Sequence, residues 1–137
     1  MDGLIWNVKD HPEWVLKELV NPCVGWCKEV DVEIGRTQTA AKAGLGPKVI
    51  AVKDCGVIPV GYGTEGKTAP HSVGWIVMEK ITPATPPPDS NHEVETQRLK
   101  TELLAFGIRG WDNNPANVIF GTTASHPTPT WWAIDFA

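Results

Sequence analysis

A run of prolines divides the chain into two parts of different character. Residues 82–89 have the sequence Thr-Pro-Ala-Thr-Pro-Pro-Pro-Asp. Because proline lacks a backbone N–H and has a fixed φ, this segment is expected neither to continue a strand nor to form a helix. The segment therefore predicts a stiff linker over 81–90, between residues 1–80 and residues 91–137. Since the chain has only 137 residues, both parts are expected to belong to one domain.

The part before the linker is predicted to be a sheet with one helix. Apolar runs at 4–8 and 14–20 flank the turn formers Asp10 and Pro12 and predict a hairpin, although a helix starting near residue 10 also fits the second run. Apolar residues at helical spacing predict a helix over 28–43, ended by Gly44. Three more strands are predicted at 49–52, 57–62 and 73–79, the first two joined by a tight turn. The expected sheet has five antiparallel strands.

The part after the linker is predicted to form one helix and a second hairpin. Ser90 and Glu93 have the spacing of a capping box, which places the start of the helix at Ser90. The helix is expected to extend to about residue 106 and to bury four apolar side chains: Val94, Leu99, Leu103 and Phe106. Residues 117–120 and 131–136 are expected to pair around a turn at 121–130 that is rich in proline and threonine.

Composition limits the partners and the location that can be expected. The net charge of −4 gives no basic surface for nucleic acid or for an anionic membrane. No apolar run approaches the length of a membrane span, and the first ten residues do not have the pattern of a signal peptide. The three cysteines, Cys23, Cys27 and Cys55, cannot all pair within one chain, which predicts reduced thiols and a cytoplasmic location.

Two motifs in the second part suggest a chemistry. Asp112 precedes Asn117 by five positions, with Pro115 between them and an apolar run at 118–120 behind them. Asp135-Phe-Ala follows the predicted hairpin. The first pattern resembles the catalytic loop of protein kinases and related small-molecule kinases, and the second resembles their metal-binding Asp-Phe-Gly. A surface turn is the alternative explanation of Asn-Asn-Pro. Over nearly its whole length the chain resembles the protein-kinase-like superfamily, including aminoglycoside- and choline-kinase-like proteins.

The resemblance implies roles for the two motifs. Asp112 would position the hydroxyl that accepts the phosphoryl group, since phosphoryl transfer depends mainly on a well-placed nucleophile. Asn117 and Asp135 would hold Mg²⁺ between the phosphates of ATP, because this hard cation prefers oxygen ligands and takes few of them from protein.

The resemblance also assigns residues of the first part to nucleotide binding. Val15-Leu-Lys17 resembles the third-strand Val-Ala-Ile-Lys motif, so Lys17 would contact the nucleotide phosphates, although a solvated lysine is the alternative. Glu33, or Glu29 one turn earlier, would be the helix glutamate that pairs with Lys17. The run at 73–79 resembles the strand that enters the hinge beside adenine. It gives three hinge candidates: Met78, Glu79 and Lys80.

Several positions depart from the kinase pattern. Gly110 stands where the kinase loop has histidine, and Ala137 stands in place of the last glycine of Asp-Phe-Gly. Only Gly3 precedes the first predicted strand, so no glycine-rich loop is expected, and no activation segment is expected either. The chain is therefore expected to be an α+β, kinase-like domain truncated at both ends. Its five-stranded sheet with one helix would be followed by a reduced C-terminal lobe of one helix and a catalytic-loop hairpin.

Two functions are compatible with these residues. One is a minimal phosphotransferase that uses ATP and Mg²⁺; the other is a catalytically inactive kinase mimic, or pseudokinase, that binds a protein. A reduced second lobe would leave apolar faces around Trp111, Trp131 and Trp132 without cover. A homodimer or another protein partner is therefore expected to cover them.

Overall fold

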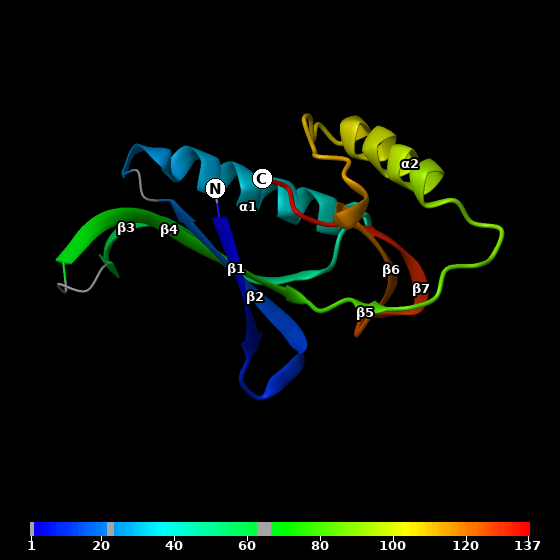
Figure 1. Ribbon diagram of the computed structural model, residues 1–137, viewed down its shortest axis with the longest axis horizontal. Helices are drawn as coiled ribbons and strands as arrows, with labels where there is room; N and C mark the ends of the chain where they lie inside the picture. The colour runs from blue at the N-terminus through cyan, green and yellow to red at the C-terminus, as the bar shows by residue number, and fades with distance from the viewer. Residues whose placement is uncertain (1, 22–23, 63–66) are drawn as a thin grey trace.

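The first part of the chain is a twisted antiparallel sheet crossed by one helix (Figure 1). The computed structural model describes residues 2–21, 24–62 and 67–137. The sheet order is β1-β2-β4-β3. Its strands are β1 (Asp2–Val8), β2 (His11–Asn21), β3 (Val49–Tyr62) and β4 (Lys67–Glu79). The whole fold is α+β, with a second, three-stranded sheet formed by the linker and the part after it.

The hairpin alternative is correct for the first two apolar runs. β1 and β2 pair antiparallel, and Asp10 in the turn between them has a positive φ of 65°. Aspartate tolerates this left-handed conformation better than most residues, which suits a tight turn. Lys17 lies opposite Ile5 of β1 and opposite Ile76 of β4, so the predicted strand position of Lys17 is confirmed.

The prediction of five strands is wrong, because two of the predicted strands form one. β3 continues through the expected turn as a 14-residue strand, and its pairing with β4 shifts register between Lys53 and Gly56. A β-bulge has the same local preference for glycine as a turn, and it lets the strand bend without ending. Within the described residues the first sheet therefore has four strands.

One face of this sheet is covered by α1 (Cys27–Lys42), which follows the short helix η1 (Val24–Trp26). Val30 and Ile34, one turn apart, are buried against Leu19 and Ile76 of the sheet. Burial of each such side chain stabilises the fold by about 1.5–3 kcal/mol. Gly74 allows this close packing, because a Cβ there would lie 2.8 Å from Cγ1 of Val30. The helix then ends near Gly44, whose φ of +75° agrees with the predicted stop.

The expectation of reduced cysteines is wrong for two of the three. Cys27, at the start of α1, forms a disulfide with Cys55 of β3. The Cys55 N–H also donates to Asp31 Oδ1 of α1 at 3.0 Å. An odd number of cysteines excludes complete pairing but leaves one bridge open, and the fold brings these two together. The placement of Cys23 lies outside the described residues.

The linker and the part after it form a three-stranded sheet with the order β5-β6-β7. Its strands are β5 (Thr82–Pro83), β6 (Val118–Thr123), which follows the short helix η2 (Pro115–Asn117), and β7 (His126–Ala133). Two expectations are corrected here. The linker supplies a short strand, and the hairpin turn contains only residues 124 and 125 instead of 121–130. β5 and β7 lie at the edges of this sheet, where proline is tolerated because one side of the strand needs no ladder hydrogen bonds.

The second helix, α2 (His92–Ala105), begins later than predicted. Asn91 is its N-cap, accepting from the N–H groups of Glu93 and Val94, whereas the Ser90 hydroxyl donates to the Pro87 carbonyl. The buried face contains Thr96, Leu99 and Leu103, at spacings of three and four residues. Two of the four predicted buried side chains are instead exposed, Val94 by 61% and Phe106 by 55%. Val94 is exposed because it lies about 140° around the helix axis from the buried Leu99.

A second hydrophobic core joins the two parts of the chain. It combines the end of α1 and the segment after it with α2, the loop before η2, and the hairpin. Its buried members are Ala40, Leu45, Leu99, Leu103, Ile108, Trp111, Val118, Ala133 and Phe136. Trp111 and Trp132 are each at least 96% buried and Trp131 is half-buried, so the prediction that these tryptophans lack cover is wrong. In the part of the chain that the structure describes, no helix is long and apolar enough to cross a membrane.

Candidate functional site

A cavity of about 390 Å³ lies where the sheet, α1 and the C-terminal segment meet. Its walls are largely apolar and come from both parts of the chain: Ile5, Val15, Met78, Ile81, Ile119 and Ile134. Its lining also contains five charged residues: Lys17, Glu33, Glu79, Lys80 and Asp135. A more open depression of about 490 Å³ between α1 and β3 has only two lysines as charged groups. The smaller cavity is the candidate site because it combines apolar walls with opposite charges.

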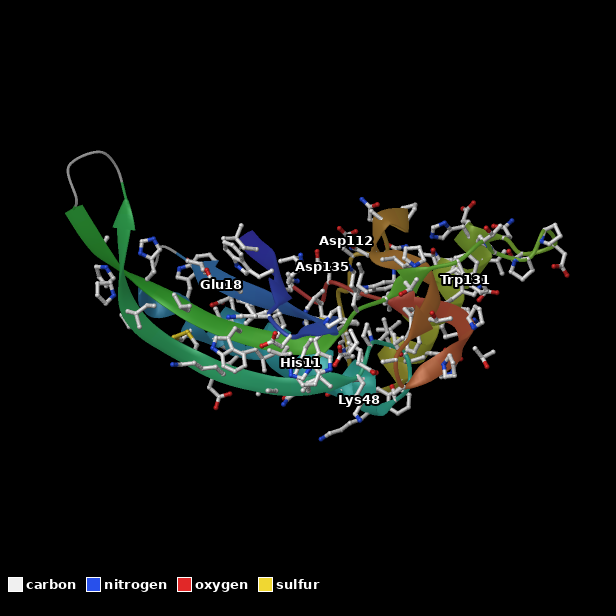
Figure 2. All side chains as sticks on the ribbon, turned by 90° about the horizontal axis from the view of Figure 1, so that it is seen from below. His11, Glu18, Lys48, Asp112, Trp131 and Asp135 are labelled. Carbon is white, nitrogen blue, oxygen red and sulfur yellow. A yellow bond between two sulfur atoms is a disulfide. The ribbon has the colours of Figure 1, made fainter. Side chains whose placement is uncertain are left out.

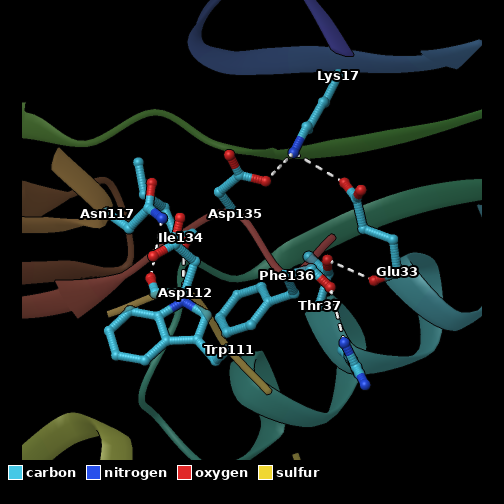
Figure 3. Close-up of polar contacts among 10 residues, drawn as sticks. Lys17, Glu33, Thr37, Trp111, Asp112, Asn117, Ile134, Asp135 and Phe136 are labelled. Carbon is cyan, nitrogen blue, oxygen red and sulfur yellow. Dashed lines mark hydrogen bonds and ion pairs between the residues drawn. The ribbon is translucent and has the colours of Figure 1, made fainter. Parts of the chain in front are cut away.

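Lys17 connects three elements that are distant in the sequence (Figure 3). Its Nζ lies 2.8 Å from Oε2 of Glu33 on α1 and 3.1 Å from Oδ1 of Asp135 in the C-terminal segment. The predicted contact between Lys17 and Glu33 is therefore present, and Glu29, the alternative partner, is exposed. This arrangement brings three of the predicted site residues together.

The three charges differ in their access to solvent. The side chain of Glu33 is 2% exposed and that of Lys17 is 14% exposed, whereas that of Asp135 is 50% exposed. Burial alone would lower the pKa of the Lys17 ammonium, but the charges and hydrogen bonds of Glu33 and then Asp135 outweigh it and raise the pKa. Lys17 therefore stays protonated at neutral pH. The half-exposed Asp135 is the partner that a ligand can replace most easily.

Asp135 has an unusual backbone conformation, with a positive φ of 62°. A left-handed non-glycine residue costs about 1–3 kcal/mol and persists only where its surroundings hold it. The residue before it, Ile134, donates its N–H to the Asn117 carbonyl at 2.9 Å and accepts from Trp111 Nε1 at 3.0 Å. The residue after it, Phe136, is buried. These contacts keep the Asp135 carboxylate directed at Lys17.

The loop before β6 is held by its own polar side chains. Asp112 Oδ1 accepts from the Asn114 N–H at 3.2 Å, and Asn117 Nδ2 donates to the Asp112 carbonyl at 3.0 Å. Neither Asp112 nor Asn117 belongs to the cavity lining, but the contact between Ile134 and Asn117 joins this loop to the segment that carries Asp135. Figures 2 and 3 both show Asp112 near Asp135.

The three hinge candidates are used in different ways. All three line the cavity, but Glu79 and Lys80 also make polar contacts within the protein. The N–H groups of Glu79 and Lys80 donate to the carbonyls of Lys48 and Glu13, at 2.9 and 2.8 Å. The Glu79 carboxylate is buried and accepts hydrogen bonds from Ser125 in the turn between β6 and β7. Those protein contacts occupy the Glu79 side chain. Direct contact of this segment with a nucleotide stays a prediction.

Several residues of the site were not anticipated from the sequence. Ser125 gave no local signal, because its partner Glu79 is 46 positions away. Ile119 and Ile134 could have been found, since they stand two positions after Asn117 and one before Asp135, next to the two motifs. Trp111 was expected only to form part of an uncovered apolar face, whereas its indole N–H holds the segment before Asp135.

Asn117 and Asp135 offer oxygen donors of the kind that Mg²⁺ prefers. No group of three or more Asp, Glu, His or Cys side chains within residues 2–21, 24–62 and 67–137 could hold a metal ion by itself. Mg²⁺ commonly takes one or two protein oxygens and completes its shell with phosphates and water. A metal ion held by Asn117 and Asp135 would therefore need further oxygen ligands from outside the protein.

Comparison of the chain with protein-family models, with curated proteins and with solved structures found no match.

Proposed function

We propose that the chain has a kinase-like fold, binds ATP with Mg²⁺ in the cavity, and acts as a minimal phosphotransferase. The observation that carries this proposal is the Lys17–Glu33–Asp135 cluster in the lining of a largely apolar cavity. Apolar walls suit the flat adenine base, and a buried lysine suits the phosphates. The order of Lys17, Glu33, Asp112, Asn117 and Asp135 along the chain also supports the kinase-like assignment.

In this proposal each polar residue has a separate task. Lys17 binds phosphate oxygens, and Glu33 holds the Lys17 side chain in place. Asp112 orients the acceptor hydroxyl, whose oxygen attacks the γ-phosphorus as the bond to the β–γ bridging oxygen breaks and ADP leaves. Asp112 or water takes the hydroxyl proton. Asn117 and Asp135 would hold Mg²⁺, which when bound neutralises charge on the phosphate oxygens.

The contact between Lys17 and Asp135 predicts that ATP and Mg²⁺ bind cooperatively. Phosphates alone compete with Asp135 for Lys17 and leave a carboxylate facing the phosphate charges. Mg²⁺ alone takes Asp135 from Lys17 without supplying a new partner for the ammonium. When both bind, each of the separated charges gains a partner, so their joint binding is stronger than either alone.

Thermal unfolding with ATP, with Mg²⁺ and with both tests this proposal. Together, at about 100 times the dissociation constant, they should raise the unfolding free energy by about 2.7 kcal/mol, a shift of several degrees. Asp135→Asn should abolish the shift. Because asparagine tolerates a positive φ as well as aspartate does, this variant removes the charge without adding backbone strain. Asp112→Asn should keep the shift and lose phosphate transfer.

A kinase mimic that binds a protein is the second candidate. The edge strand β1 favours it, because Leu4, Ile5 and Trp6 are each more than half exposed. An edge strand without charged side chains at these positions can pair with another chain. Absence of any thermal shift at millimolar ATP with Mg²⁺ would replace the phosphotransferase proposal with this one.

A further inference from the structure

The last residue of β4 makes a contact that the proposed reaction does not require directly. Glu79 is 4% exposed, and its carboxylate accepts from the Ser125 N–H at 2.9 Å and from the Ser125 hydroxyl. A buried carboxylate is costly unless such partners satisfy it. The segment that contains Glu79 was expected to contact adenine. Glu79 lines the cavity, and its carboxylate joins the first sheet to the turn between β6 and β7.

This Glu79–Ser125 contact links the elements that carry opposite sides of the charged cluster. On one side, Glu79 lies opposite Trp14 of β2, three residues before Lys17. On the other side, Ser125 forms the turn of a hairpin whose far end contains Asn117 and leads into Asp135. The six residues of β6 span about 20 Å, so a small rotation at the turn is carried to the far end.

The hairpin is therefore held at both ends. At the far end, the Ala133 N–H donates to the Leu45 carbonyl, and the Ile134 N–H donates to the Asn117 carbonyl. At the turn, Ser125 is held by Glu79. Close to the turn, β5 pairs with β6 through Thr82 and Pro83, which lie opposite Thr122 and Gly121 and form a pivot with a long arm to the far end.

We propose that Glu79 is a positioning residue that sets the approach of Asp135 to Lys17 through Ser125. The inference rests on the proposed function, because the property that Glu79 would control is the cooperative binding of ATP and Mg²⁺. Release of the turn lets the hairpin move about its pairing with β5. Asp135 and Asn117 are then no longer held in a fixed position relative to Lys17, while the cavity walls that the first sheet contributes stay in place.

The first test measures how much Mg²⁺ strengthens ATP binding, as the ratio of the dissociation constants without and with the metal. Glu79→Ala should reduce this ratio about fivefold or more. Ser125→Ala should reduce it in the same direction by less, because the backbone N–H of residue 125 remains. Ser125→Thr keeps the hydroxyl and should restore the wild-type ratio. Asn91→Ala is the control, since it destabilises α2 by removing the hydrogen bonds to the N–H groups of Glu93 and Val94 and leaves both Glu79 and Ser125 in place.

The second test needs no nucleotide and measures hydrogen exchange at the Ile134 N–H. Ser125→Ala should make this exchange about tenfold faster, because the loss of a hydrogen bond to a charged group changes an equilibrium constant by about that factor. Asn91→Ala should not change it relative to global unfolding. Unchanged exchange at Ile134 and an unchanged Mg²⁺ ratio in both Glu79→Ala and Ser125→Ala would overturn the inference. Faster exchange in a protein whose wild type shows no Mg²⁺ effect would uphold the mechanical link and overturn the nucleotide proposal.

Discussion

Reduction of the Cys27–Cys55 disulfide should destabilise the fold substantially. The two cysteines are 28 positions apart, and the bridge ties the start of α1 to β3. Closing a loop of this length removes an unfolded-state entropy equivalent to about 3.6 kcal/mol at 25 °C. With the unfolding entropy typical of a chain of this size, the loss corresponds to a fall of about 12 °C in melting temperature.

The assay is thermal unfolding followed by circular dichroism, with and without a phosphine reductant. Cys23 should be replaced by serine throughout, so that no third thiol can exchange with the bridge. A matched variant that also carries Cys27→Ser and Cys55→Ser should melt at the same low temperature in both conditions. Equal melting temperatures for the bridged protein with and without reductant would refute the reasoning. An intact mass that does not change on reduction would contradict the bridge itself.

Three further predictions concern the charged cluster and the glycines. Glu33→Gln should lower the unfolding free energy by about 3 kcal/mol in urea titrations, because it leaves the half-exposed Asp135 as the charged partner of the buried Lys17 ammonium. A loss below about 1 kcal/mol, as for a surface ion pair, would contradict this. Because the folded pKa of Lys17 is raised, its stabilisation relative to Lys17→Met should be constant below about pH 10.4 and decline above it; a difference that grows with pH would have the wrong sign. Gly121→Ala should destabilise the fold by about 1–3 kcal/mol, since the new Cβ would collide with the Thr82 carbonyl. Gly35→Ala should stabilise the fold by about 1 kcal/mol, because Gly35 lies on α1 with open space around it. Equal effects of the two substitutions in urea titrations would refute the packing argument.

The sequence predicted those features of the fold whose cause is local. The turn at Asp10 and the helix stop at Gly44 each depend on one residue that tolerates a positive φ. The choice between strand and helix for residues 14–20 could not be made from periodicity, and the resemblance of Val15-Leu-Lys17 to a strand motif decided it correctly. A motif carries information about neighbours that hydrophobic spacing over seven residues lacks.

Features that depend on distant partners were missed. Lys53 and Gly56 suit a turn and a bulge equally, and only pairing with β4 decides that β3 continues. Ser90 and Asn91 are both good N-caps. The start of α2 was decided by the linker, because the Ser90 hydroxyl donates to the Pro87 carbonyl while Asn91 caps the helix. The disulfide and the Glu79–Ser125 contact join residues 28 and 46 positions apart, for which no local rule exists.

For the candidate site, the sequence identified the charges but not their surroundings. Lys17, Glu33 and Asp135 were named from motifs, and the structure brings them into contact. The cavity beside them was not predicted, because its walls come from β1, β2, the end of β4, β6 and the C-terminal segment together. The cover of Trp111 was missed for the same reason, since α1, α2 and the hairpin share one core with it.

The most direct test of the nucleotide proposal is a calorimetric titration of ATP into the protein at saturating Mg²⁺, compared with the Asp135→Asn variant. We expect saturable binding at one site in the wild type, weakened by tenfold or more when Mg²⁺ is omitted, since such couplings are typically about 5–150-fold. The variant should show only the weak binding, with or without the metal. Equal ATP affinities for wild type and variant in Mg²⁺, or no heat of binding in either, would contradict a nucleotide site at the Lys17–Glu33–Asp135 cluster.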